Sequence, residues 1–128
     1  MGVQIMESQF PAADYAVERI SLDGRIITSP ASTYLMLAAE TIWRAGIMKD
    51  AMLVVDSAVH PIDGSIIVCQ FNGELRLKRL RLAPARCLED LNYPDRHQML
   101  TSETLIMGVV TYIINDARSG EFDDSPVI

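Results

Sequence analysis

The sequence predicts a single, mainly β domain, on the basis of chain length, β-rich segments and closely spaced turn signals. The chain has 128 residues, of which 49% are hydrophobic, so its size and apolar content fit one core. Segments rich in β-branched and aromatic residues alternate with pairs of turn-forming residues. These pairs include Asp23-Gly24, Ser29-Pro30, Asp63-Gly64, Asn72-Gly73 and Tyr93-Pro94. We therefore expect a β domain with short connections.

Six segments have the composition of β-strands. They cover about Val17 to Leu22, Thr33 to Ala38, Met52 to Asp56, Ser65 to Phe71, Glu74 to Leu82, and Thr104 to Ile114. Asn72-Gly73 predicts a β-hairpin, because a two-residue type I′ turn needs positive φ at both central residues. The run from Ala39 to Met48 loses β character, so we expect one short helical turn there, with Thr41 near its start.

Composition argues against several classes of function. The net charge of -6 disfavours direct DNA binding, because nonspecific affinity for nucleic acid comes from clustered Lys and Arg. Five basic residues nevertheless lie between Arg76 and Arg86, which leaves room for a local acidic partner. No apolar run is long enough to span a bilayer and the N-terminus has no signal-peptide pattern, so we expect a cytoplasmic protein. Cys69 and Cys87 lie among apolar residues, where reduced cysteine is expected.

Residues that could bind a metal or cofactor do not form a recognisable site. His60 is expected in a turn and His97 in a polar loop, without Cys or carboxylate at ligand spacing. The neighbouring carboxylates Glu89 and Asp90 would point to opposite sides of an extended chain, and we expect both on solvated faces. The sequence contains no glycine-rich phosphate loop. We therefore expect neither a metal nor a cofactor.

The apolar residues change face within the predicted strand ELRLKRLRL. Leu75 and Leu77 would share one face, whereas Leu80 and Leu82 would share the other, so the phase changes near Lys78. A β-bulge would restore one apolar face and could turn Lys78 inward, where desolvation favours the neutral amine that general-base catalysis needs. A twisted strand whose cations reach solvent also explains the pattern, and periodicity alone favours it.

Six sequence blocks, taken in order, resemble the UmuD branch of the LexA-type self-cleaving Ser-Lys peptidases. They are FPAADY, ERISL, SPASTYLMLA, MLVVDSA, DGSIIVCQFNGELRLKRLRL and SETLIMGVVTYII, and they span most of Phe10 to Ile114. The resemblance implies a compact β fold like that of the LexA/UmuD C-terminal domain. With the sequence pattern, it divides the chain into a flexible arm (1–9), a peptidase-like domain (10–116) and an acidic tail (117–128) that we expect to be mobile.

Two positions correspond to the catalytic dyad of this family. Lys78 falls on the position of the lysine base. The nucleophile loop, Ser-Gly-Asp-Ser-Met-like in the family, reads AAETI from Ala38 to Ile42, which is one residue shorter and puts Thr41 opposite the serine. A threonine hydroxyl can act as a nucleophile, but its methyl group restricts χ1 and the missing residue should displace the hydroxyl. The family's scissile Cys-Gly or Ala-Gly is also replaced, by Ser8-Gln9.

These departures predict a chain in the UmuD-prime-like, already processed form. We expect a regulatory subunit of an SOS-induced, error-prone translesion DNA polymerase, which acts in the DNA-damage response by protein–protein binding and lacks peptidase activity. The resemblance implies a homodimer that binds a Y-family polymerase of the UmuC type and the RecA nucleoprotein filament. Two alternatives stay open: an active self-cleaving peptidase with Lys78 as general base and Thr41 as nucleophile, or a decoy that forms heterodimers with a UmuD or LexA homologue.

Overall fold

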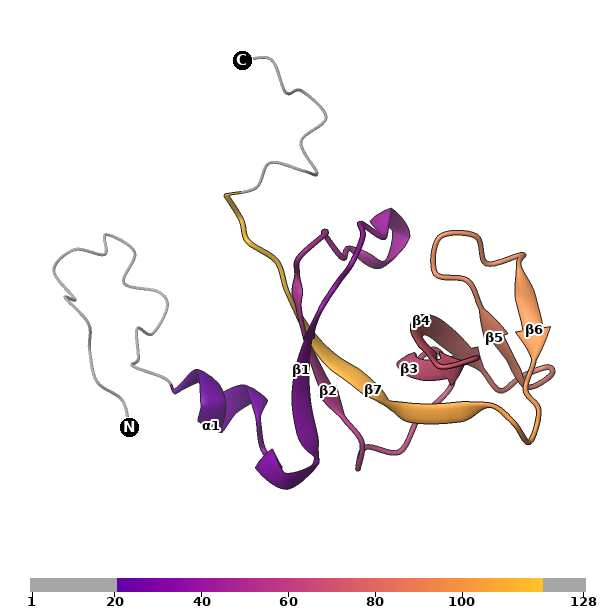
Figure 1. The fold of residues 1–128 in the computed structure, drawn as a ribbon, viewed down its shortest axis with the longest axis horizontal. Coiled ribbons are helices and arrows are strands. Elements are labelled where there is room, and N and C mark those ends of the chain that lie inside the picture. The colour runs from indigo at the N-terminus through magenta and orange to yellow at the C-terminus, as the bar shows by residue number, and fades with distance from the viewer. Residues whose placement is uncertain (1–20, 119–128) are drawn as a thin grey trace, which may run out of the picture.

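One antiparallel β-sheet dominates the computed structural model, which describes residues 21–118 (Figure 1). Its seven strands are ordered β1-β2-β7-β3-β4-β5-β6. Their bounds are β1 Thr33–Leu37, β2 Met52–Asp56, β3 Ile66–Phe71, β4 Glu74–Arg81, β5 Cys87–Glu89, β6 His97–Met99 and β7 Leu105–Ile114. The predicted mainly β fold is confirmed, and five of the six expected strands lie within about one residue of their predicted bounds.

Strand β7 joins the two halves of the sheet, as Figure 1 shows. Its C-terminal part pairs with β2 from Val109 to Ile114, and its N-terminal part pairs with β3 from Leu105 to Val109. The register shifts once along each of these pairings. Gly108 lies next to this crossing, where an added Cβ would be 2.7 Å from Val55 Cγ1. The absence of a side chain at Gly108 therefore lets β7 pass close to β2.

The predicted hairpin between β3 and β4 is confirmed. Asn72 and Gly73 have φ of 50° and 83°, as a type I′ turn requires. Cα pairing then continues without a shift from Phe71 opposite Glu74 to Ile66 opposite Arg79. The bulge that we considered in β4 is therefore absent from its pairing with β3, and the phase change of the leucines needs another cause.

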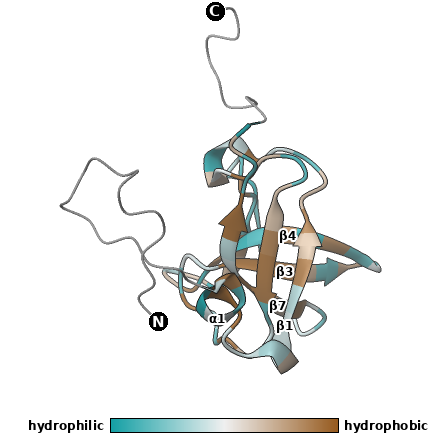
Figure 2. Ribbon diagram, turned by 90° about the vertical axis from the view of Figure 1, so that its left-hand side faces the viewer, coloured by the Kyte–Doolittle hydropathy of each residue, from teal (hydrophilic) through white to brown (hydrophobic). Residues whose placement is uncertain are grey.

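Two hydrophobic cores on opposite faces of the β3–β4 hairpin explain that phase change. Val68 lies opposite Leu77, and both pack in a core with Leu53, Val55 and Ile47. Neighbouring residues of β3 point the other way. The second core holds the buried side chains of Ile67, Cys69, Leu80, Leu88 and Val109. Strand β4 thus supplies leucines to both cores, and Figure 2 shows that β3 and β7 carry mostly hydrophobic residues.

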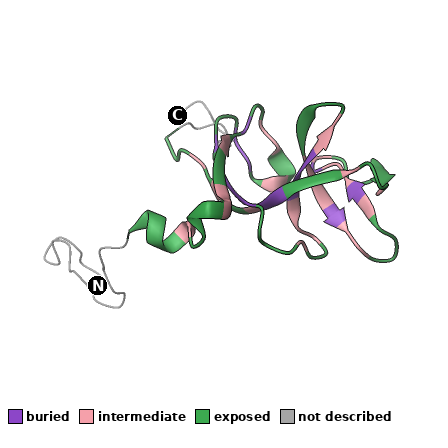
Figure 3. Ribbon diagram, turned by 60° about the horizontal axis from the view of Figure 1, so that its bottom comes forward, coloured by how far each residue is buried: buried purple, intermediate pink, exposed green. Residues whose placement is uncertain are grey.

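The helical elements are short and lie at the periphery. They are α1 Leu22–Ile26 and the two 3₁₀ turns η2 Pro30–Ser32 and η3 Trp43–Ala45. The strand expected up to Leu22 is wrong at its C-terminal end, because the Ser21 hydroxyl caps α1 by accepting from the Gly24 N–H at 3.3 Å. Residues 17–20 lie outside the described part of the chain. No residue of α1 is buried, and Figure 3 colours this helix as mostly exposed.

The turn expected between Ala39 and Met48 is confirmed as the single 3₁₀ turn η3. Gly46 ends it in the left-handed conformation, with φ of 70°. Ile42 and Ile47 form an isolated antiparallel bridge around it, so the segment is a closed loop and not a longer helix.

Two strands, β5 and β6, were not expected, and His97 lies in β6 instead of a loop. Each has three residues with charged or polar neighbours, which leaves little periodic signal. The division into arm, domain and tail stays a prediction, since residues 1–20 and 119–128 are not described. Within residues 21–118, no helix is long and apolar enough to cross a membrane.

Candidate functional site

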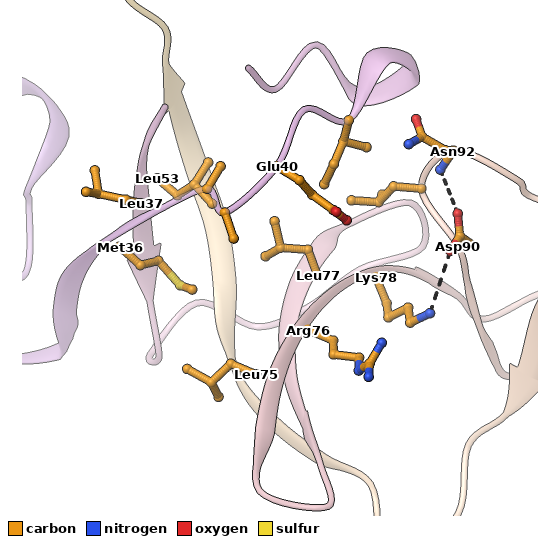
Figure 4. A pocket seen from close by; sticks show the side chains of 14 residues that line it. Met36, Leu37, Glu40, Leu53, Leu75, Arg76, Leu77, Lys78, Asp90 and Asn92 are labelled. Atoms are coloured by element: carbon orange, nitrogen blue, oxygen red, sulfur yellow. Dashed lines mark hydrogen bonds and ion pairs between the residues drawn. The ribbon is translucent and has the colours of Figure 1, made fainter. Parts of the chain in front are cut away.

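A cavity of about 260 Å³ lies between the loop that follows β1, the N-terminal half of β4 and the turn that follows β5 (Figure 4). Met36, Leu53, Leu77 and Leu91 are among its apolar walls. Its polar residues are Glu40, Arg76, Lys78, Asp90 and Asn92. The two cations come from β4 and the two carboxylates from the loops, so the opposite charges balance. A mostly apolar cleft with a few converging polar groups is the usual form of a binding site.

Lys78 reaches into this cavity from β4. Its Cα lies opposite Ile67 of β3, on the face of the second core, and its side chain is 17% exposed. The Nζ atom lies 3.9 Å from Asp90 Oδ2, as the dashed line in Figure 4 marks. Asp90 is a partner for the ammonium form of the side chain, whereas general-base chemistry needs the neutral amine.

Asp90 also organises the turn that borders the cavity. Its Oδ1 accepts hydrogen bonds from the backbone N–H groups of Asn92 and Tyr93, each at 2.9 Å. The Asn92 side-chain oxygen in turn accepts from the Arg44 N–H at 3.2 Å. The turn after β5 is therefore linked on one side to Lys78 and on the other to the loop that contains Thr41.

Thr41 is held at the base of its loop. Its Oγ1 accepts a hydrogen bond from the Lys49 N–H at 3.0 Å, eight residues along the chain. Its neighbours Glu40 and Ile42 line the cavity, but Thr41 is not among the lining residues. Within residues 21–118, no hydrogen bond joins Thr41 to Lys78. The structure places Lys78 at the cavity and leaves Thr41 out of the cavity lining.

The sequence reasoning missed the role of Glu89 and Asp90. Instead of lying free on solvated faces, Glu89 Oε1 accepts from Arg81 Nε at 3.1 Å and Asp90 pairs with Lys78. The two carboxylates do point to different partners, as expected for neighbours on a strand. The missing signal was β5 itself, because its pairing with β4 places Glu89 opposite Arg79 and leaves Asp90, the next residue, 3.9 Å from Lys78.

The remaining reactive residues form no second site. Cys69 is buried and Cys87 partly buried, both are free thiols, and burial raises the pKa of Cys69. His60 and His97 lie apart from the cavity lining. Among the described residues, no group of three or more His, Cys, Asp or Glu is arranged to hold a metal ion.

Comparison with known proteins agrees with the fold. A family model described as Peptidase S24-like matches residues 2–111. Protein ImpA of Salmonella typhimurium is 36% identical over 110 residues, which cover 84% of this chain and 76% of ImpA. Protein SamA of the same species is 36% identical over 110 residues, covering 85% and 78% of the two chains. Protein MucA of Escherichia coli is 31% identical over 106 residues, covering 80% and 73%. The chain therefore belongs to the S24-like peptidase family, in its UmuD branch.

Proposed function

We propose that this chain is a UmuD-prime-like regulatory subunit of an SOS-induced, error-prone translesion DNA polymerase, and that it acts by protein–protein binding without cleaving itself. One observation carries the proposal: the Thr41 hydroxyl accepts from the Lys49 N–H, whereas Lys78 faces Asp90. A nucleophile and its base must lie within hydrogen-bond reach of each other. Membership of the UmuD branch supports the pathway, and the different partners of Thr41 and Lys78 support the loss of self-cleavage.

The loop around Thr41 is fixed at several points, which argues against a simple rearrangement into the cavity. Ile42 and Ile47 exchange backbone hydrogen bonds of 2.7 and 3.1 Å. The Asn115 side chain, just after β7, donates to the Gly46 carbonyl at 2.8 Å and accepts from the Met48 N–H at 3.0 Å. Moving Thr41 toward Lys78 would break part of this set, and each bond lost costs about 1 kcal/mol.

Exposed apolar residues at the tip of the β3–β4 hairpin support the binding role and the proposed homodimer. Leu75 lies opposite Gln70 on β3, and Gln70 lies opposite Leu105 on β7, so the three side chains form one row on one face. Leu75 and Leu105 are 52% and 54% exposed, and Met107 is also exposed. Large apolar side chains exposed together on one face are typical of protein interaction sites.

Intact-mass measurement over days at pH about 10, near the ordinary pKa of lysine, tests the loss of self-cleavage. We expect no change of mass in the wild-type chain, and none in Thr41→Ser, because the shortened loop still displaces the hydroxyl. A supplied arm peptide of an intact UmuD-type protein should also stay uncleaved. Cleavage by the wild-type chain that disappears in Lys78→Ala would contradict the proposal and establish the active peptidase.

Co-purification tests the binding role. The chain should co-purify with a UmuC-type Y-family polymerase and should bind a RecA nucleoprotein filament, with a known UmuD-prime protein as positive control. Leu75→Ser and Leu105→Ser should weaken self-association in sedimentation experiments, whereas the exposed Glu103→Ser on the adjacent turn should not. Failure to bind either partner under conditions where the control binds would refute the proposal. Exchange only with an intact UmuD or LexA homologue would instead favour the decoy.

A further inference from the structure

Two surface turns beside the cavity carry aromatic and arginine side chains. Trp43 and Arg44 belong to η3, whereas Tyr93 and Arg96 lie in the turn between β5 and β6. All four residues are exposed, Trp43 by 55% and Tyr93 by 53%. Asn92 Oδ1 joins the two turns by accepting from the Arg44 N–H at 3.2 Å, and Figure 1 shows the turns next to each other. We call Trp43, Arg44, Tyr93 and Arg96 the Trp43–Tyr93 patch.

The exposure of Trp43 is unusual for the single tryptophan of a small domain. Burial of such a large aromatic side chain is one of the largest hydrophobic gains that folding offers. Its neighbours Ile42 and Ala45 pack against the first core, whereas more than half of Trp43 stays in water. Tryptophan, tyrosine and arginine are the residues that contribute most energy at protein interfaces. The composition of the patch is therefore typical of a binding surface.

Neither guanidinium group of the patch forms an ion pair with a carboxylate of residues 21–118. The guanidinium carbon of Arg96 lies 4.4 Å from the centroid of the Tyr93 ring. This stacking leaves the N–H groups at the edge of the guanidinium available. The Arg96 N–H also donates to the Tyr93 carbonyl at 2.8 Å, so the backbone holds the stacked pair in place. An arginine presented in this way can bind a carboxylate through two parallel hydrogen bonds.

The charges around the patch favour a peptide over a nucleic acid as the ligand. Nucleic-acid surfaces need many cations at phosphate spacing, whereas the patch carries only Arg44 and Arg96 in a chain of net charge -6. Glu40 at the cavity and Asp95 in the second turn would repel a continuous phosphate backbone. A peptide can instead place single carboxylates at the two arginines and apolar side chains between them.

From this composition and charge, we propose that the Trp43–Tyr93 patch binds an acidic segment of a partner protein that also carries aromatic side chains. Carboxylates of the segment pair with Arg44 and Arg96, and an aromatic side chain packs on Trp43. Ile42 and Asn92, the neighbours of the two aromatic residues, line the cavity, so the bound segment continues toward the cavity mouth. The inference deepens the proposed binding role and rests on it, because it names the chemistry of the partner's contact.

Tryptophan fluorescence of the full chain tests the proposal, because Trp43 is the only tryptophan and reports on the patch directly. The probe is a short peptide of alternating aspartate and phenylalanine. A peptide of alternating lysine and phenylalanine, and an oligothymidylate of the same length, are the controls. We expect the acidic peptide to shift the emission of Trp43 in a saturable way, and neither control to do so.

Arginine variants separate the patch from general electrostatic attraction. Arg44→Gln and Arg96→Gln should each weaken binding of the acidic peptide by about fivefold or more. Arg86→Gln removes the same charge from an exposed position between β4 and β5 and should weaken it by less than about twofold. Circular dichroism checks that each variant is folded, which we expect because all three side chains are exposed.

Three results would overturn the proposal: no saturable shift with the acidic peptide, equal weakening in Arg86→Gln, or a saturable shift with oligothymidylate in place of the peptide. The last result would make the patch a nucleic-acid surface. The titration contains neither polymerase nor RecA, so its failure would leave the co-purification result unaffected. Failed co-purification with intact peptide binding would refute only the named partners.

Discussion

Replacing Gly108 by alanine tests the close crossing of β7 and β2. A Cβ at this position would lie 2.7 Å from Val55 Cγ1 and 3.3 Å from the Asp56 carbonyl oxygen. The first distance is far inside the ordinary carbon–carbon contact of about 3.5 to 4.0 Å. Val55 is fully buried, so its side chain cannot turn into solvent. Overpacking of this kind costs about 1–3 kcal/mol, and we expect Gly108→Ala to lower the free energy of unfolding by about 2 kcal/mol.

A double-mutant cycle with Val55→Ala isolates the steric clash. Val55→Ala alone removes two buried methyl groups and should cost about 1–2 kcal/mol. In that background, Gly108→Ala should cost at least ~1 kcal/mol less than in the wild-type chain, because the clashing methyl is gone. Urea unfolding followed by circular dichroism gives each free energy.

Gly24→Ala in the exposed helix α1 is the matched control for this cycle. The nearest atoms to a Cβ there are 3.7 Å away, so it should be neutral or slightly stabilising. If Gly108→Ala costs the same with and without Val55, the steric reasoning is refuted.

Three further predictions concern polar contacts. The hydrogen bond from the Ser32 hydroxyl, and to a lesser degree the one from a backbone N–H, lower the pKa of Asp56. The ionised carboxylate therefore stabilises the fold above the unfolded pKa of about 4, and this stabilisation is lost as pH falls through the folded pKa. Urea unfolding at decreasing pH should show this loss, and Ser32→Ala should reduce it; an unchanged pH profile would contradict the assignment. Asp90→Asn keeps an acceptor for the turn after β5 and should lower the free energy of unfolding by less than ~1 kcal/mol. Asp90→Ala removes the acceptor and should lower it by about 1–2 kcal/mol more. Equal losses in the two variants would argue that the turn does not need the acceptor. Asn115→Ala removes both bonds to the loop at residues 46–48 and should speed amide hydrogen exchange in that loop. Faster exchange at the end of β7 alone would contradict this prediction.

The long strands could be predicted from the sequence because their composition and pairing agree. Met52–Asp56 is buried almost throughout, and the Asn-Gly turn fixed the next hairpin. α1 could not be predicted, since its Asp23-Gly24 pair indicates a turn and the helix depends on the cap provided by Ser21. The two cores could not be separated either, because the phase change of the leucines fits a bulge as well as a strand that contributes to both faces.

The candidate site was predictable only in part. Lys78 was identified by the phase change and by the resemblance, and the structure places it in the cleft. Asp90 was missed because its role depends on β5, a strand of three residues that brings it opposite Lys78. A contact between residues 12 positions apart in the sequence, created by such a short strand, leaves no local pattern to read.

The shortened loop supports the proposed loss of the dyad more than the substitution of serine by threonine does. A substitution alone would leave the hydroxyl in place, with a methyl group added. Here the hydroxyl accepts from the Lys49 N–H, and the bridge between Ile42 and Ile47 fixes the register of the loop that follows. Restoring serine without restoring loop length would leave the same bonds closing the loop. We therefore expect a cleft that keeps its lysine and its apolar walls to act by binding, as proposed above, and not by cleavage.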